Sequence, residues 1–289
     1  MKTLVKYEFL KILRKKSTLI VMAVSLLLTA FLFGLPILRY QTYNADGVIR
    51  GLDGIAYTKE QYSQISVPLT EEYITETIRE VQALFENPDH VGFDGTDQFL
   101  IGDAYWNGIA PREELLKTIA STYAAPGVTA WYSSLPELNI TNGANFYQTR
   151  EAKIATLLND SSRGLSDEQK EYWQNINSQV ETPFQYGYYE GWLTINTCFE
   201  LLMFAILAVC IVLAPVFSGE YQAGTDAVIL SGKYGKTKLT TAKIIASYLF
   251  GLFAFTIHIL VAFGLPLVAF GVDGWNLPMQ IAGTSIPYP

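Results

Sequence analysis

The sequence predicts a membrane protein, mainly α, with three transmembrane helices and a mostly helical extracellular domain inserted between the first and second helices. Two observations lead to this class. Three long apolar runs each exceed the roughly 20 residues that a helix needs to cross a bilayer. A long polar stretch of ordinary globular composition separates the first run from the second. Since helices pair all their backbone groups internally in lipid, we expect each run to be helical.

The three apolar runs contain almost no charge. Ser17–Leu38 has 22 residues and none, Leu193–Phe217 has 25 residues with one charge at Glu200, and Ile244–Phe270 has 27 residues with His258 as its one titratable group. A soluble helix rarely stays apolar on every face for this length. We therefore expect transmembrane helices over residues 17–38, 192–217 and 244–270.

The first run has a second interpretation, a cleaved signal peptide, because a charged segment precedes it. Its apolar stretch is longer than the roughly 7–15 residues of signal peptides, and no small-x-small cleavage pattern follows Leu38. The first run is therefore expected to be a retained anchor.

Charge predicts the orientation. Residues 1–17 carry six Lys or Arg against one Glu, and residues 218–243 carry four Lys against two acidic residues. The stretch 41–190 carries nine basic and 22 acidic residues. Short Lys/Arg-rich segments stay in the cytoplasm. We expect a multi-pass protein of a bacterial plasma membrane, with a cytoplasmic N-terminus and an extracellular domain over residues 39–191.

The first 16 residues have an amphipathic pattern. Val5, Phe9, Ile12 and Leu13 share one face, and most of the basic residues lie opposite. This pattern favours a cytoplasmic helix over residues 1–16 that lies on the membrane surface. The simpler alternative is that the basic residues only set the topology.

The extracellular domain has helix signals and no convincing strand. Thr70 is a candidate N-cap followed by two glutamates, Pro111 suits a first helical position, and Ser166 with Gln169 fits a capping box. Apolar spacing adds a helix from Phe146 to Leu158. Both cysteines, Cys198 and Cys210, fall within the second apolar run, so we expect no disulfide in this domain.

Catalytic and cofactor motifs are missing from the sequence. It has two histidines, no Cys/His metal spacing, no phosphate-binding Gly-Lys-Ser/Thr loop and no nucleophile elbow. The segment Gly92–Asp97 resembles a calcium loop only loosely, because the later ligand positions are absent. We expect no catalytic residue, cofactor, metal or nucleic-acid partner.

Glu200 and His258 are the ionisable groups inside the apolar runs. Such groups are costly in lipid and usually face a cavity or a partner, so both are candidates for a substrate path. The alternatives are that Glu200 reaches external water near the end of its helix, and that His258 is neutral and hydrogen-bonded to a neighbouring helix.

The cytoplasmic segment 218–243 is more elaborate than a simple connector. It resembles the first cytoplasmic loop of ABC-2-type transporter permeases, in which a Glu after the second span precedes a Gly-Thr pair, a small helix, a Ser-x-x-Tyr-Gly-Arg/Lys turn and an Ala-Lys-Ile helix start. The basic N-terminal stretch resembles the helix that such permeases carry before their first span. The residues that match the loop are Glu220, Gly224, Thr225, Leu230, Ser231, Tyr234, Gly235, Lys236, Lys238 and Ala242–Ile244.

The resemblance implies that this segment is a coupling helix that docks on a separate ABC ATP-binding subunit and, with a second permease half of the same or another kind, forms an exporter. An apolar face over residues 227–230, tight turns at Gly232 and Gly235, and basic residues would suit that docking. Glu220 would lie near the start of the helix, where its charge favours the helix dipole. The alternative is a lipid-facing loop whose lysines only fix topology.

Two features depart from the family pattern. The long extracellular domain is similar to that of antimicrobial-peptide exporters and lipid transporters, which implies an amphiphilic substrate such as a peptide, drug or lipid. Family members usually have six spans, so we expect the chain, whose residues 271–289 form an extracellular segment, to be truncated. The competing classes are a membrane-anchored sensor or immunity protein that binds a ligand through its extracellular domain, and an assembly scaffold for surface proteins.

Overall fold

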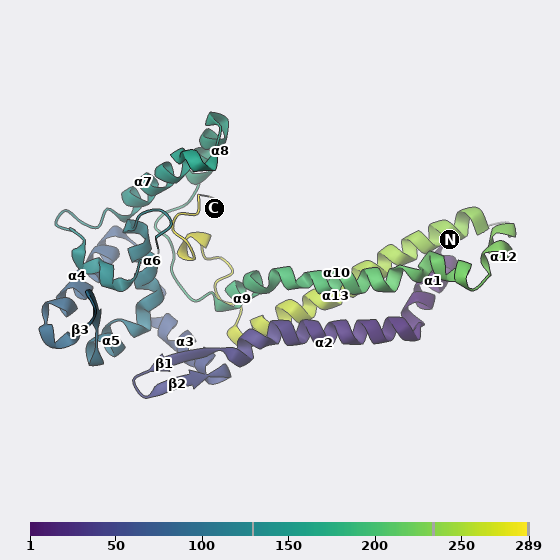
Figure 1. Ribbon diagram of the computed structural model, residues 1–289, viewed down its shortest axis with the longest axis horizontal. Helices are drawn as coiled ribbons and strands as arrows, with labels where there is room; N and C mark the ends of the chain where they lie inside the picture. Colours follow the sequence, from purple (N-terminus) through teal and green to yellow (C-terminus); the bar gives the residue numbers. More distant parts are fainter. Residues whose placement is uncertain (129, 233–234, 288–289) are drawn as a thin grey trace. The chain divides into compact units, whose positions relative to one another are not determined.

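The structure is a computed structural model that describes residues 1–128, 130–232 and 235–287, with residues 226, 230 and 236 described by their backbone alone (Figure 1). The chain divides into two compact units. The helical bundle comprises Met1–Tyr40 and Glu190–Val272, and the second unit comprises Gln41–Tyr189 and the residues from Asp273 onward. The chain is mostly helical, as predicted.

The helical bundle begins with α1 (Lys2–Arg14) and α2 (Lys16–Arg39). The second long helix consists of α9 (Glu190–Cys198), a 3-10 turn (Phe199–Leu202), α10 (Met203–Leu213) and α11 (Pro215–Gln222). The short α12 (Asp226–Ser231) and a π-helical turn (Gly235–Leu239) lead into α13 (Thr240–Phe270).

Three helices among the described residues are long and apolar enough to cross a membrane: Lys16–Arg39, Glu190–Gln222 and Thr237–Phe270. This confirms the three predicted apolar spans. The second and third helices extend further than the predicted ranges 192–217 and 244–270, because polar residues continue the helix beyond the apolar run. Much of the segment 218–243, predicted as a separate element, is therefore the end of one long helix and the start of the next.

The long helices of the bundle pack through a row of buried residues on α13 that recurs every four positions. Half of the row consists of alanines, which let neighbouring helices approach closely. α2 and α10 run beside α13 (Figure 1), and α2 contributes buried Met22, Ser25 and Phe33. The row on α13 comprises Ala242, Ala246, Phe250, Ala254, His258, Ala262, Pro266 and Phe270.

The second unit has its own apolar core between α4 (Glu71–Glu86) and α6 (Glu113–Tyr123). The fully buried residues that these two helices contribute are Ile74, Ile78, Val81, Leu115, Leu116 and Ile119. The other helices are α3 (Gly51–Gln64), α5 (Gly102–Gly108), α7 (Phe146–Asn159) and α8 (Asp167–Asn177). Short 3-10 turns cover Pro88–His90, Ala110–Arg112, Tyr132–Glu137, Ser161–Arg163 and Met279–Ile281.

Two predicted helix caps are confirmed. The Thr70 side chain accepts a hydrogen bond from the Tyr73 amide, and Ser166 and Gln169 form a reciprocal capping box. The prediction for Pro111 was wrong in detail, because Pro111 lies in the 3-10 turn that precedes α6 and not in the α-helix.

The second unit contains strands, although its sequence has no convincing strand signal. One antiparallel hairpin pairs β1 (Gln41–Asn44) with β2 (Gly47–Arg50), and another pairs β3 (Val91–Asp94) with β4 (Asp97–Leu100). Each strand has four residues, too few for a visible alternation of apolar and polar positions. The calcium-like loop around Gly95 is the tight turn of the second hairpin, with Gly95 at φ +63°.

The residues from Asp273 onward belong to the second unit. Ile281 joins its apolar core, and Gln280 is fully buried. The buried Arg150 of α7 donates from Nε to the Thr284 carbonyl at 2.8 Å and from Nη2 to the Ile286 carbonyl at 2.9 Å. The segment predicted as 271–289 therefore contributes core residues to the second unit.

Candidate functional site

The end of α11 explains the Gly-Thr pair of the loop motif. The Gly224 amide donates to the Tyr221 carbonyl, and the Thr225 amide donates to the Glu220 carbonyl, both at 3.1 Å. These two bonds define a Schellman motif, which ends a helix with one residue in the left-handed region. Gly224 takes that position at φ +66°. The pair therefore ends the second long helix and redirects the chain into α12.

The predicted tight turns lie elsewhere. Gly232 has φ −71° and ψ 145°, an extended conformation that any residue adopts. Gly235 begins the π-helical turn, directly after residues that lie outside the described chain. The requirement for glycine that the structure describes in this segment lies at Gly224 and not at Gly232.

Glu220 joins three helices. It lies in the last turn of α11, and its Oε1 accepts hydrogen bonds from the Lys11 Nζ of α1, at 3.1 Å, and from the Lys243 Nζ of α13. The prediction that Glu220 starts the coupling helix and favours its dipole was wrong. A carboxylate at a helix C-terminus faces the negative end of the dipole, so the two ammonium groups offset an unfavourable position.

Lys243 is the buried partner in this cluster, with 3% of its side chain exposed. Its Nζ also donates to the Val216 carbonyl at 3.3 Å and lies 5.5 Å from the centre of the Phe217 ring. A buried charge is costly unless it is paired and hydrogen-bonded, and Lys243 has both kinds of partner. Glu220, Lys11 and Lys243, here called the Glu220 cluster, hold α1, α11 and α13 together.

Sequence reasoning placed Lys11 only on the polar face of the basic N-terminal helix, and it used Lys243 only as part of the loop motif. The position of Lys243, next to the buried Ala242 and one residue before the apolar run, was a signal that its side chain faces the bundle. Lys11 carried no such signal, because its partner lies 209 residues away in the sequence.

α12 presents apolar surface beyond the cluster. Val228 is 75% exposed and Ile229 is partly buried. The hydroxyl of Ser231 donates to the Val228 carbonyl within the helix. Lys238 is exposed on the π-helical turn. The predicted Tyr234, like the side chains of Leu230 and Lys236, lies outside the described residues.

A groove of about 660 Å³ lies beside the Glu220 cluster, between α1 and the α11–α12 turn. Glu8, Lys11 and Arg14 line it from α1, and Glu220 and Ile229 line it from the opposite side. Its lining combines charged and apolar groups at the same end of the bundle as α12.

The two candidates for a substrate path have contrasting surroundings. Glu200 is exposed on the 3-10 turn that interrupts the second long helix. His258 is fully buried, with Nδ1 2.7 Å from the Ala254 carbonyl and Nε2 3.0 Å from the Ser25 hydroxyl of α2. His258 therefore bridges two helices, which is the alternative that its sequence context left open.

Comparisons of the chain with protein-family models, with curated proteins and with solved structures give no match. Among the described residues, no three His, Cys, Asp or Glu side chains are grouped so as to hold a metal ion. The chain is thus a helical protein with three potential membrane spans, and any functional assignment depends on the loop motif and on the geometry of the Glu220 cluster.

Proposed function

We propose that this chain is the permease subunit of an ATP-driven ABC exporter in a bacterial plasma membrane. It moves an amphiphilic substrate together with a second permease half, and a separate ABC ATP-binding subunit hydrolyses ATP. The observation that carries the proposal is the Glu220 cluster, which joins the base of α12 to α1 and α13.

A coupling element needs a firm connection to the helices that it moves. The Schellman motif fixes α12 directly to the end of α11. The Glu220–Lys243 pair connects the same end of α11 to the first turn of α13. A displacement of α12 is therefore passed to two of the three long helices, which is what transmission from an ATPase to a transport path requires.

A coupling element also needs a surface for its partner. α12 offers the exposed Val228, and the neighbouring turn carries the exposed Lys238. Charge supports a cytoplasmic partner. The segment before the first apolar run, 1–17, and the segment between the second and third runs, 218–243, are both basic, and short basic segments stay in the cytoplasm. An apolar side chain framed by charged groups is typical of a protein interface.

The test is co-purification of the tagged full-length chain after expression together with its neighbouring genes. We expect an ATP-binding subunit and ATPase activity in the purified complex. The Val228→Asp variant places a charge on the docking surface. We expect the amount of copurified ATP-binding subunit to fall at least about tenfold, as it does for substitutions at the centre of an interface.

Val128→Asp is the matched control, because Val128 is an exposed valine of the second unit, at 57%. It should retain the ATPase. Recovery of no ATP-binding subunit with any variant, or full retention by Val228→Asp, contradicts the proposal. The first result, combined with ligand binding by the second unit, would favour the sensor or immunity protein.

A further inference from the structure

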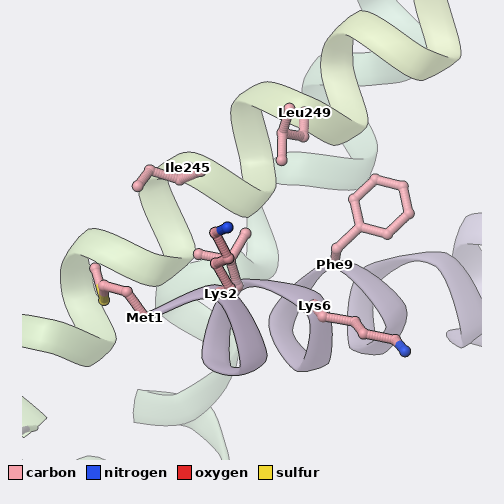
Figure 2. A pocket seen from close by; sticks show the side chains of 7 residues that line it. Met1, Lys2, Lys6, Phe9, Ile245 and Leu249 are labelled. Carbon is pink, nitrogen blue, oxygen red and sulfur yellow. The ribbon is translucent and has the colours of Figure 1, made fainter.

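An apolar groove of about 650 Å³ lies between α1 and the beginning of α13 (Figure 2). Met1, Val5 and Phe9 line it from α1, and Ile245 and Leu249 line it from α13. Figure 2 shows Phe9 projecting from α1 towards α13, Ile245 and Leu249 on α13, and the amino group of Lys6 directed away from α13. Ile245 and Leu249 remain 40% and 41% exposed. The groove is therefore an open, apolar surface feature and not part of the packed core.

Two lysines border this groove. Lys2 and Lys6 both line it, and the amino group of Lys2 lies between the two helices in Figure 2. Within the described part of the chain, neither lysine forms an ion pair, whereas Lys11 of the same helix is held by Glu220. The site thus combines an apolar channel with two available cationic groups.

The depth of the groove in the bundle fits the polar boundary of a bilayer. α13 has 31 residues, which at about 1.5 Å per residue span about 46 Å. The hydrocarbon core is about 30 Å thick, so the first turns of α13 extend into the headgroup region. Ile245 and Leu249 lie in the second and third turns, where a lipid phosphate and the upper part of its acyl chain are found.

We propose that this groove binds one anionic phospholipid. The acyl chain lies along Phe9, Ile245 and Leu249, and the phosphate is held by the amino groups of Lys2 and Lys6. The net charge of the segment 1–17, with six basic residues against one acidic residue, selects an anionic headgroup over a zwitterionic one. The proposal does not depend on ATP coupling, so the two can fail separately.

The experiment is native mass spectrometry of the full-length chain in detergent, titrated with dioleoylphosphatidylglycerol or with dioleoylphosphatidylcholine. We expect one tightly bound phosphatidylglycerol per chain and weaker binding of phosphatidylcholine. The double variant Lys2→Gln/Lys6→Gln should lose about 25-fold in affinity for phosphatidylglycerol, since each lysine at an anionic surface contributes about fivefold.

Lys15→Gln/Lys16→Gln is the matched control for charge. Lys15 follows the end of α1, and Arg14, the last residue of α1, already lies eight residues beyond Lys6, about 12 Å along a helix and more than the screening length of about 8 Å at physiological salt. A second pair tests the apolar channel: Ile245→Trp fills the groove, whereas Ile244→Trp alters an exposed neighbour that does not line it. We expect Ile245→Trp to lose the bound phosphatidylglycerol and Ile244→Trp to retain it.

Four results overturn the proposal. The first is equal affinity of the chain for phosphatidylglycerol and phosphatidylcholine. The second is a loss of phosphatidylglycerol affinity in Lys15→Gln/Lys16→Gln equal to that in Lys2→Gln/Lys6→Gln. The third is an unchanged affinity for phosphatidylglycerol in Ile245→Trp. The fourth is a lipid-free dimer that dissociates in Ile245→Trp, which would assign the groove to a second copy of this chain. Unchanged melting temperatures of the variants show that lipid loss does not follow from unfolding.

Discussion

At the residue scale, the Glu220 cluster is the feature with the largest expected energetic effect. Removing one member of a buried ion pair leaves an uncompensated charge and costs about 3–5 kcal/mol. Glu220→Ala leaves the buried Lys243 without its carboxylate, so we expect a loss of stability of about that size. The measurement is thermal or denaturant unfolding of the full-length chain in detergent.

The double variant provides the discriminating test. Glu220→Gln combined with Lys243→Met removes both charges of the pair. Because the two residues are in contact, we expect a smaller loss of stability than the sum of the losses from Glu220→Gln and Lys243→Met made separately. Lys11→Gln should cost no more than about 1 kcal/mol, since the Lys11 side chain is 62% exposed. If the losses of stability from Glu220→Gln and Lys243→Met add up to that of the double variant, Glu220 and Lys243 are not energetically coupled.

A second residue-scale prediction concerns the Schellman motif. Gly224→Ala places a side chain at φ +66°, where left-handed backbone costs about 1–2 kcal/mol per non-glycine residue. We expect faster hydrogen exchange in the last turn of α11. Gly219→Ala in the same helix should instead stabilise α11 and slow its hydrogen exchange. A helical glycine costs roughly 0.5–1 kcal/mol relative to alanine, and the Cβ added at Gly219 has no contact closer than 3.9 Å.

At the element scale, the row of small residues on α13 sets how closely the long helices pack. Ala254 is fully buried in this row, between Phe250 and His258. Ala254→Leu inserts three carbons into a close contact, and overpacking of this kind costs about 1–3 kcal/mol. We expect a lower melting temperature in detergent, measured by the helical circular dichroism signal.

Gly264→Leu is the control for this prediction. Gly264 lies on the same helix, but no neighbouring atom lies within 4 Å of a Cβ built at this position. It should leave the melting temperature unchanged or raise it, because leucine is a better helix former than glycine. Equal destabilisation by both variants would mean that the row on α13 does not control the packing.

The elements differ in how far the sequence predicts them. Apolar length identified the three long helices, and cap chemistry identified α4 and α8, because these signals lie within one element. The hairpins were missed because four-residue strands have little periodicity. The helix ends at Gln222 and Thr240 were also missed, since helices continue through polar residues until a motif such as Gly224–Thr225 stops them.

The candidate site was predictable only in part. The loop motif drew attention to Glu220, Gly224 and Thr225, which lie together in the structure. Their roles differ from the predicted ones, because a role depends on which helices meet at that point. The partners Lys11 and Lys243 come from separate helices, and pairing over such sequence distances is a property of tertiary packing.

At the scale of the whole molecule, the chain passes between the helical bundle and the second unit three times, after Tyr40, Tyr189 and Val272. The last passage leads from α13 into residues that the core of the second unit holds. Arg150 anchors these residues through two backbone carbonyls, and its guanidinium lies 5.3 Å from the Phe184 ring centre. Burial lowers the pKa of Arg150, and the ion pair with Glu151 at 2.6 Å opposes part of that effect.

We therefore predict that Arg150→Met loosens the segment after α13. The change removes the Arg150 donor of the Thr284 carbonyl and leaves the Ile286 carbonyl with the longer bond from Gln280 Nε2 at 3.4 Å. An unsatisfied buried acceptor costs about 1–3 kcal/mol. Hydrogen exchange over residues 279–286 of the full-length chain should rise, and the second unit should unfold at a lower temperature. Arg79→Met is the control, because Arg79 is exposed and its ion pair within the described part of the chain is with Glu76 on its own helix. Unchanged exchange in Arg150→Met would show that the other contacts, the burial of Ile281 and the Thr122–Thr284 hydrogen bond, are enough to hold the segment in place.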